Sequence, residues 1–262
     1  GGSITGTGNL VKNGTGTSGL YLDSGFSGDV VINSGTLEVE GSIGGEISGS
    51  GQLTALSTLT LIGAHYFNQK VDGDTLNFDL GSGNRTGIAL TNATMSLLKV
   101  SSGTLELDAF HGTHRQAIDL VSGATLEVNE SGTLGSISGA GDLKIDPAGA
   151  GLRSLEFGAD DGSTTYSGNI TDTGDDVFSK VGTGTWTVTG DITGLGTLNI
   201  SEGVVSIGNG GTTGSTTAGI TNNAALVFNR SNSITHSASI SGTGSLEKLG
   251  AGTLTLSGNN GY

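Results

Sequence analysis

The sequence has no cysteine, a single proline and a single tryptophan among its 262 residues. Without cysteine, an exported chain has to be stabilised by hydrogen-bonded ladders and packing, because disulfides are excluded. The scarcity of proline, together with regularly spaced Val, Ile and Leu, argues against a disordered low-complexity chain. Glycine is abundant, with 50 residues, but it does not recur at every third position, which excludes a collagen triple helix.

Basic residues are also scarce, with 10 Lys and Arg against 24 Asp and Glu, and the formal net charge is -14. Nucleic acids and anionic membrane surfaces bind clustered Lys and Arg, so neither is an expected partner. No stretch approaches the ~20 apolar residues of a membrane helix, and we expect no membrane insertion by this segment. The first residues show neither a charged leader nor an apolar run, so we expect no signal peptide within this segment. Because the chain begins and ends inside repeated sequence motifs, we expect it to be a fragment of a longer polypeptide.

Short phrases recur along the chain, which indicates one small structural unit repeated many times. Ile-[Ser/Thr]-Gly-x-Gly-x-Leu occurs at residues 4–10, 47–53, 137–143 and 240–246. Lys-x-Gly-x-Gly-Thr occurs at residues 12–17, 180–185 and 248–253. Gly-Thr-Leu-x-[Val/Leu/Ile] occurs at residues 35–39, 103–107, 196–200 and 252–256. Repetition on this scale favours a long surface scaffold over an enzyme with a pocket.

Apolar residues alternate with polar ones inside these phrases, as in Leu105-Glu106-Leu107 and Leu126-Glu127-Val128. A period of two predicts short strands with one buried face, and the Gly, Ser, Asn and Asp residues between them predict turns. Residues 90–100 come nearest to a helical pattern, but their Thr, Asn and Ser content makes a poor helix. We therefore expect an all-β chain without a long α-helix.

Such strands form either antiparallel hairpins or stacked coils. Asp72-Gly73 and Asp161-Gly162 are candidate hairpin turns. The same text at Leu105 and Leu126, however, returns after about 20 residues, which is the length of one coil of a parallel β-helix. We therefore predict a single β-helix domain over residues 1–262, a solenoid of about a dozen coils.

The inward positions of these coils form the predicted core. We expect burial of Leu10, Leu37, Val39, Leu53, Leu105, Leu107, Leu126, Val128, Leu143, Leu198, Ile200, Leu246 and Leu254.

The text from Gly242 to Tyr262 resembles the autotransporter-associated β-strand repeat, which occurs in passenger domains of type V secretion proteins. Looser copies lie at residues 4–17 and 178–190, where Trp186 replaces the usual leucine, and the motif is nearly lost between residues 56 and 115. The resemblance implies a right-handed parallel β-helix displayed outside the outer membrane of a Gram-negative bacterium. It also implies a role as an adhesin, a self-aggregation factor or a biofilm component.

Signatures of catalysis are scarce. A serine hydrolase needs Gly-Asp-Ser-Gly or Gly-x-Ser-x-Gly at a strand–turn–helix junction, but Gly-Asp-Ser is absent and Ser50 lies in repeat text. Residues 14–19 match Gly-x-Gly-x-x-Gly, but no helix follows to bind a pyrophosphate. We expect no enzymatic activity, no catalytic residue and no cofactor.

Candidate metal ligands are present but do not form a recognisable site. His111 and His114 lie close together, but a zinc site needs a third and a fourth ligand. Acidic turns at residues 72–74, 160–162 and 172–176 supply oxygen ligands of the kind that calcium takes. None has the nonapeptide of calcium β-rolls, and ordinary Asp-Gly turns explain them, so no metal site is predicted.

The repeat pattern breaks at residues 65–85 and 109–116, where we expect loop insertions. Repeat scaffolds gather functional residues in such insertions, so at least one of them should project and shape a contact surface. The candidate interaction residues are His65, Tyr66, Asp72, Asp74, Arg85, Phe110, His111, His114 and Arg115.

Three functions fit these observations. The favoured one is a surface rod that associates weakly with itself or binds a host or surface ligand, since this needs only long polar faces. A β-helix enzyme that degrades polysaccharide needs two carboxylates about 5–9.5 Å apart. An inert stalk that presents a distal domain needs neither a binding face nor a pair of carboxylates.

Charge also limits how two such rods meet. If Glu106 and Glu127 lie on consecutive rungs, we expect both to point outward roughly 5 Å apart. Their repulsion would then confine self-association to neutral faces of Ser, Thr and Asn.

Overall fold

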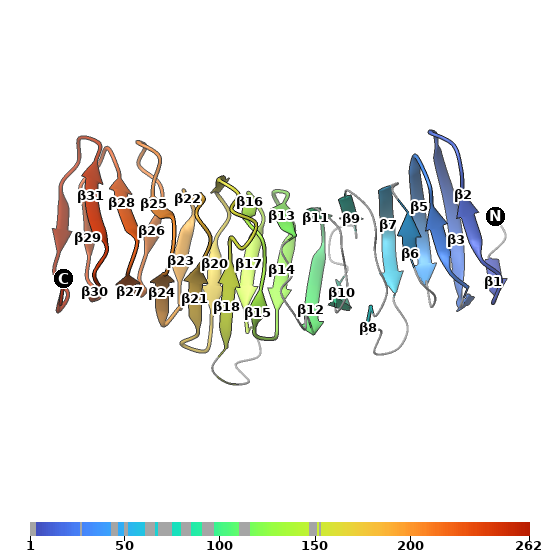
Figure 1. The fold of residues 1–262 in the computed structure, drawn as a ribbon, viewed down its shortest axis with the longest axis horizontal. Coiled ribbons are helices and arrows are strands. Elements are labelled where there is room, and N and C mark those ends of the chain that lie inside the picture. The colour runs from blue at the N-terminus through green and yellow to red at the C-terminus, as the bar shows by residue number, and fades with distance from the viewer. Residues whose placement is uncertain are drawn as a thin grey trace.

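The computed structural model describes residues 4–26, 28–42, 47–49, 52–60, 66–67, 75–79, 85–90, 97–109, 116–146, 151 and 153–262. Every regular element in these ranges is a β-strand, and the strands stack along a rod with the two termini at opposite ends (Figure 1). The strands of every described pair run parallel. The predicted all-β parallel solenoid is therefore confirmed, while its right-handedness and its number of coils stay predictions. Nothing in the described ranges forms a helix of the length and apolarity that crossing a membrane requires.

The longest sheet, called sheet 1, runs the length of the rod and contains 13 strands. They are β1 (Ile4–Gly6), β3 (Thr17–Phe26), β5 (Thr36–Ser42), β7 (Gln52–Thr60), β9 (Thr75–Asp79), β11 (Leu97–Ser102), β13 (Ala117–Leu120), β16 (Ile137–Gly139), β19 (Thr164–Tyr166), β22 (Thr185–Val188), β25 (Val204–Ile207), β28 (Ala225–Asn229) and β31 (Ser245–Leu249).

Two further sheets form the other sides of the rod. Sheet 2 has eight strands: β8 (Tyr66–Phe67), β10 (Arg85–Leu90), β12 (Thr104–Ala109), β14 (Thr125–Val128), β17 (Asp142–Ile145), β20 (Ile170–Asp172), β23 (Asp191–Thr193) and β26 (Ser215–Thr216). Sheet 3 has six strands: β15 (Gly132–Thr133), β18 (Ser154–Phe157), β21 (Val177–Lys180), β24 (Thr197–Ile200), β27 (Gly219–Asn222) and β30 (Ile240–Ser241).

Two small sheets lie near the ends. One contains β2 (Leu10–Lys12), β4 (Val30–Ile32) and β6 (Ile47–Gly49), and the other contains β29 (Ile234–His236) and β32 (Leu254–Leu256).

From β16 to β27 the chain visits sheets 1, 2 and 3 in strict rotation. Strands β16, β17 and β18 form one coil, and β19, β20 and β21 form the next coil directly against it. A coil therefore has three short strands joined by three corners.

In-register stacking builds the core of the rod. In sheet 2 the residues Leu105, Leu126, Leu143, Ile170 and Ile192 pair in succession, and each is fully buried. Leu126, Leu143 and Ile170 thus each rest on an apolar equivalent in the coil before and in the coil after. This continuous stack is the main source of hydrophobic stabilisation.

The predicted core is confirmed in the middle of the rod. Leu37, Leu105, Leu107, Leu126, Val128, Leu143, Leu198 and Ile200 are buried. Burial of Leu10, Leu246 and Leu254 was overestimated by the prediction, because all three are only half-buried. They lie on β2, β31 and β32, each of which pairs on one side only, so half of the stack is missing. The side chains of Val39 and Leu53 lie outside the described residues.

The lysine of Lys-x-Gly-x-Gly-Thr caps the corner that follows it. The ammonium group of buried Lys180 donates to the backbone oxygens of the next two residues, at 2.6 and 2.7 Å. Lys12 and Lys248 bond backbone oxygens of their own corners, at 2.7 Å and at 2.5 and 2.8 Å. Each lysine therefore satisfies carbonyl groups that the turn leaves out of the strand ladder.

Replacing Leu126 tests the axial stack. Leu126→Ala should cost about 2–5 kcal/mol, and Leu126→Asp should cost more, because it places a charge among Leu105 and Leu143. Thermal unfolding followed by circular dichroism measures both changes. Val11→Asp is the matched control, since Val11 is 53% exposed. Equal midpoints for Leu126→Asp and Val11→Asp would contradict the stack.

Replacing Gly182 tests the packing of the corners. Gly182 has a φ of +71°, and a Cβ atom there would lie 2.1 Å from the backbone oxygen of Gly158. Gly123 has a φ of +86° but no atom within 4 Å of an added Cβ. Gly123→Ala should therefore cost only the backbone strain of about 1–2 kcal/mol, and Gly182→Ala clearly more. Similar losses in thermal stability would mean that the corners are not closely stacked.

Candidate functional site

Most of the interaction residues expected from the sequence lie outside the described residues: His65, Asp72, Asp74, Phe110, His111, His114 and Arg115. The backbones of the other two are placed. Tyr66 on β8 pairs with Ala89, and Arg85 at the start of β10 pairs with Thr104. The insertions at residues 65–85 and 109–116 and their role in contacts stay predictions.

A surface hollow of about 310 Å³ lies where sheet 3 turns toward sheet 1. It is lined by Thr133, Glu156, Ala159, Asp161, Val181, Gly182 and Glu202. These residues come from β15, from β18 and the corner after it, and from the corners after β21 and β24. Successive coils thus build the hollow together. Its volume is at the lower end of the range for ligand pockets, which is about 300–1,000 Å³.

The hollow is acidic and rich in hydrogen-bond acceptors. Glu156 accepts a hydrogen bond from the hydroxyl of Thr133 at 2.9 Å. Lys180 lies buried beside it, and burial lowers the pKa of Lys180. The carboxylates of Asp161 and Glu202 oppose this shift but do not cancel it. The lining is therefore suited to a ligand that supplies cationic or neutral hydrogen-bond donors.

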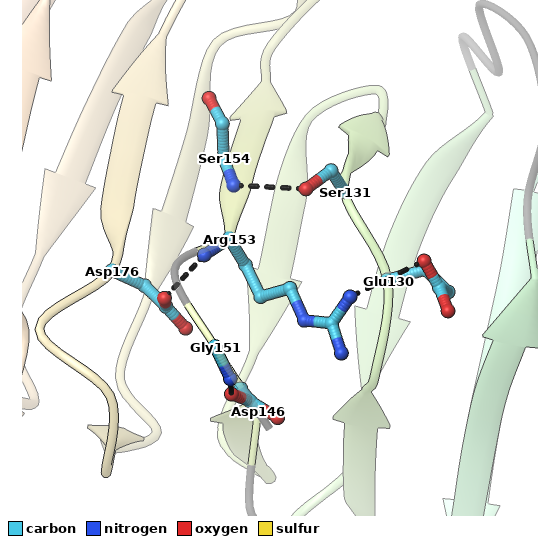
Figure 2. A network of polar contacts seen from close by, with 7 residues as sticks. All are labelled: Glu130, Ser131, Asp146, Gly151, Arg153, Ser154 and Asp176. Carbon is cyan, nitrogen blue, oxygen red and sulfur yellow. Dashed lines mark hydrogen bonds and ion pairs between the residues drawn. The ribbon is translucent and has the colours of Figure 1, made fainter. Parts of the chain in front are cut away.

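A second acidic group is buried at the corner between sheets 2 and 3. Asp146, Asp172 and Asp176, called the carboxylate cluster, are all buried. Figure 2 shows Asp176 accepting a hydrogen bond from the backbone N–H of Arg153, whose guanidinium group extends away to Glu130 at 3.4 Å. The cluster thus receives a backbone donor from Arg153, and the charge of Arg153 is directed elsewhere.

Only part of this cluster was predicted from the sequence. The acidic turn at residues 172–176 was expected to supply oxygen ligands, but Asp175 is exposed and Asp146 takes its place. The register of the strands brings Asp146 into the cluster: Ile145 pairs with Asp172, which places Asp146 beside that turn. No group of three or more His, Cys, Asp or Glu side chains in the described ranges is arranged to hold a metal ion.

The expected acidic face around Glu127 is corrected by the structure. Glu106 and Glu127 are in register on neighbouring rungs, as predicted. Glu127 is nevertheless only 2% exposed, and Lys144 on the next rung forms an ion pair with it at 3.1 Å. Lys99 and Asp119 pair across rungs of sheet 1 in the same way, at 2.9 Å. Acidic residues are thus partly neutralised along the rod.

His236 is a buried histidine at the C-terminal end of the rod. It lies beside Phe228, with 5.9 Å between the ring centroids, and its Nε2 atom is buried without a hydrogen-bond partner. Burial lowers the pKa of His236, and a hydrogen bond with the backbone of Thr216 has a smaller, opposite effect. The buried surroundings of His236 therefore favour the neutral imidazole.

Comparison with known proteins gives one relative. The chain is 31% identical, over 93% of its length, to the protein named Adhesin BmaC autotransporter of Brucella suis biovar 1 (strain 1330). It spans about a tenth of that protein's length, since the match covers 10% of the relative. No family model and no solved structure matches the chain. The parallel β-solenoid fits an autotransporter passenger domain, in agreement with the resemblance found in the sequence.

The pH dependence of stability tests the burial of His236. The folded chain binds the imidazole proton less tightly than the unfolded chain does. Stability is therefore lost as the pH falls from above about 6.5, the ordinary value, through the lowered pKa of the folded state. Comparing thermal unfolding of the native chain and His236→Leu at several pH values isolates this contribution, which is at most about 1.4 kcal/mol per pH unit. Identical pH slopes for both proteins would contradict it.

Proposed function

We propose that this chain, a segment homologous to an autotransporter adhesin, is part of a cell-surface rod that mediates adhesion. The observation that carries the proposal is the combination of a continuous parallel β-solenoid with 31% identity to an adhesin over 93% of the chain. We place the rod outside the outer membrane of a Gram-negative bacterium, where the whole protein would hold it. In this proposal the segment is not an enzyme, and it contacts a second copy of itself or a ligand on a surface or host.

One outer face of the rod is suited to contact between copies. On sheet 1 the outward residues Thr165, Thr187, Ser206 and Val227 lie in register on four successive strands. This row, called the neutral face, carries no charge until Glu247 on β31. In a chain with a net charge of -14, an uncharged face is where two copies approach with least repulsion.

Association through the neutral face should be weak and should depend on salt. The face is short, so its hydrogen bonds and its few apolar contacts supply little free energy. Repulsion between the remaining acidic surfaces is screened as salt is added, because the Debye length falls to about 10 Å at 0.1 M. Self-association should therefore strengthen from low to moderate salt.

Sedimentation velocity across a salt series tests this proposal with one charged variant. Ser206→Glu places two like charges across a contact between copies and should weaken association about fivefold, from the roughly 1 kcal/mol of a charge pair in water. Thr193→Glu is the matched control, because Thr193 is exposed on sheet 2. Equal weakening by both variants would show that net charge, and not the neutral face, decides association.

A chain that stays monomeric at every salt concentration would favour adhesion to a different ligand or a stalk. The end strands β1 and β31 are unpaired on one side, and such edges join artificially. Any dimer should therefore be tested again with capped ends.

The acidic hollow supports a second candidate function, that of a β-helix enzyme that degrades polysaccharide. Glu156 and Glu202 line it, and glycoside cleavage uses a pair of carboxyl groups. Incubation with a panel of polysaccharides, followed by assay of new reducing or unsaturated ends, separates the two functions. If the native chain generates new polysaccharide ends and Glu202→Gln does not, the enzyme function replaces the adhesin proposal.

A further inference from the structure

The carboxylate cluster buries more negative charge than its surroundings compensate. Asp146 is 1% exposed, Asp172 is 8% exposed and Asp176 is fully buried. Burying an ionised carboxylate without a paired cation is costly, and such a group is usually neutralised instead. The buried negative charge of the cluster must therefore be neutralised in another way.

Backbone donors satisfy most of the oxygens in the cluster. Asp172 accepts hydrogen bonds from the N–H groups of Gly174 at 3.0 Å and of Asp176 at 2.8 Å, one on each oxygen. Asp176 accepts one from Arg153 on Oδ1, and Asp146 accepts one from Gly151 on Oδ2 at 3.3 Å. The Oδ2 atom of Asp176 is buried and accepts none, and in Figure 2 this second oxygen points toward Asp146. One buried acceptor therefore remains open, and it is directed into the cluster.

The strands and turns packed around Asp176 carry few charged groups that face it. Asp146 faces it from the end of β17, and Asp172 from the end of β20. Arg153, before β18, directs its guanidinium group to Glu130. Asp175 in the same turn is exposed, and residues 194–197 of the next coil carry no charge. Among the described neighbours, no cation faces the open oxygen.

We propose that the carboxylate cluster is a proton-binding site in which Asp176 holds the proton, and that uptake of this proton as the pH falls tightens the corner between sheets 2 and 3. The proton removes one buried negative charge and lets the open oxygen of Asp176 donate to a neighbouring carboxylate of the cluster, a hydrogen bond that two carboxylates cannot form. The proposal stands independently of the adhesin function.

The electrostatics support this assignment. Burial raises the pKa of Asp176, and the negative charges of Asp172 and Asp146 raise it further. The hydrogen bond from the backbone of Arg153 lowers it, but not enough to reverse the shift. The folded corner thus binds this proton more tightly than the unfolded chain does. Its stability should rise as the pH falls through the raised pKa toward the ordinary Asp value, opposite in sign to the effect of His236.

Hydrogen exchange read by mass spectrometry tests the proposal at the corner itself. Exchange of peptides covering residues 151–158 and 170–180 is measured from pH 7 down to about pH 4, near the ordinary Asp value, and corrected for the intrinsic pH dependence of exchange. In the native chain, protection should increase by up to about tenfold per pH unit. Asp176→Asn mimics the protonated group and keeps an acceptor for Arg153. It should be highly protected at pH 7 and should lose the pH dependence.

Asp175→Asn is the matched control. It removes a charge from the same turn, but Asp175 is exposed, and Asn tolerates its φ of +59°. This variant should keep the slope of the native chain. A native slope in Asp176→Asn would overturn the proposal, because the proton would then be bound elsewhere.

Two further measurements keep the test decisive. If Asp176→Asn does not fold, Asp146→Asn removes a neighbouring charge and should move the onset of protection to lower pH, while an unchanged onset would overturn the proposal. Calcium at millimolar concentration, with a chelator as control, should not raise protection at pH 7. Protection by calcium in the native chain and not in Asp176→Asn would show that a cation occupies the cluster in place of the proton.

Discussion

Every coil of this rod must return directly above the previous one, and this requirement governs the rest of the structure. Parallel pairing places residues in register, so that Leu126 rests between Leu105 and Leu143 and the core is a stack of like upon like. The corners have to stack as closely as the strands, which is why Gly182 lies against the backbone of Gly158. Hydrophobic burial, turn chemistry and surface pattern all follow from this alignment.

The same alignment arranges the polar side chains into ladders. Asn169 accepts a hydrogen bond from the N–H of Asp191 at 3.2 Å, while its own N–H donates to Asp142 at 3.2 Å one coil earlier. Ser215 continues the ladder by donating to Asp191 at 2.6 Å. Lysine side chains add to these contacts. Lys144 forms an ion pair with Glu127, and Lys180 donates hydrogen bonds to the carbonyl groups of its corner. A chain without cysteine thus gains its cross-links between coils from side chains that repeat.

Repeated text in the sequence was sufficient to predict the fold class and the middle of the core, because Leu105 and Leu126 occur in nearly identical phrases. The neighbours across rungs were harder to predict, since successive coils differ in length: the partners Lys144 and Glu127 are 17 residues apart and Thr173 and Asp146 are 27 apart. The exposure of Glu127 and the membership of Asp146 in the carboxylate cluster both depended on that register. The role of Lys180 was missed because its motif was recognised only as a repeat, with no role assigned to the lysine.

The strands lie across the long axis of the rod, as Figure 1 shows, and so the hydrogen bonds between coils run along that axis. A tensile load applied at the two termini therefore acts on the contact between one coil and the next. Such contacts are arranged in series, and coils should peel off one at a time from whichever end holds least strongly. The force that the rod withstands is then set by its weakest coil and not by its length, so adding coils extends the reach of the rod without making it stronger.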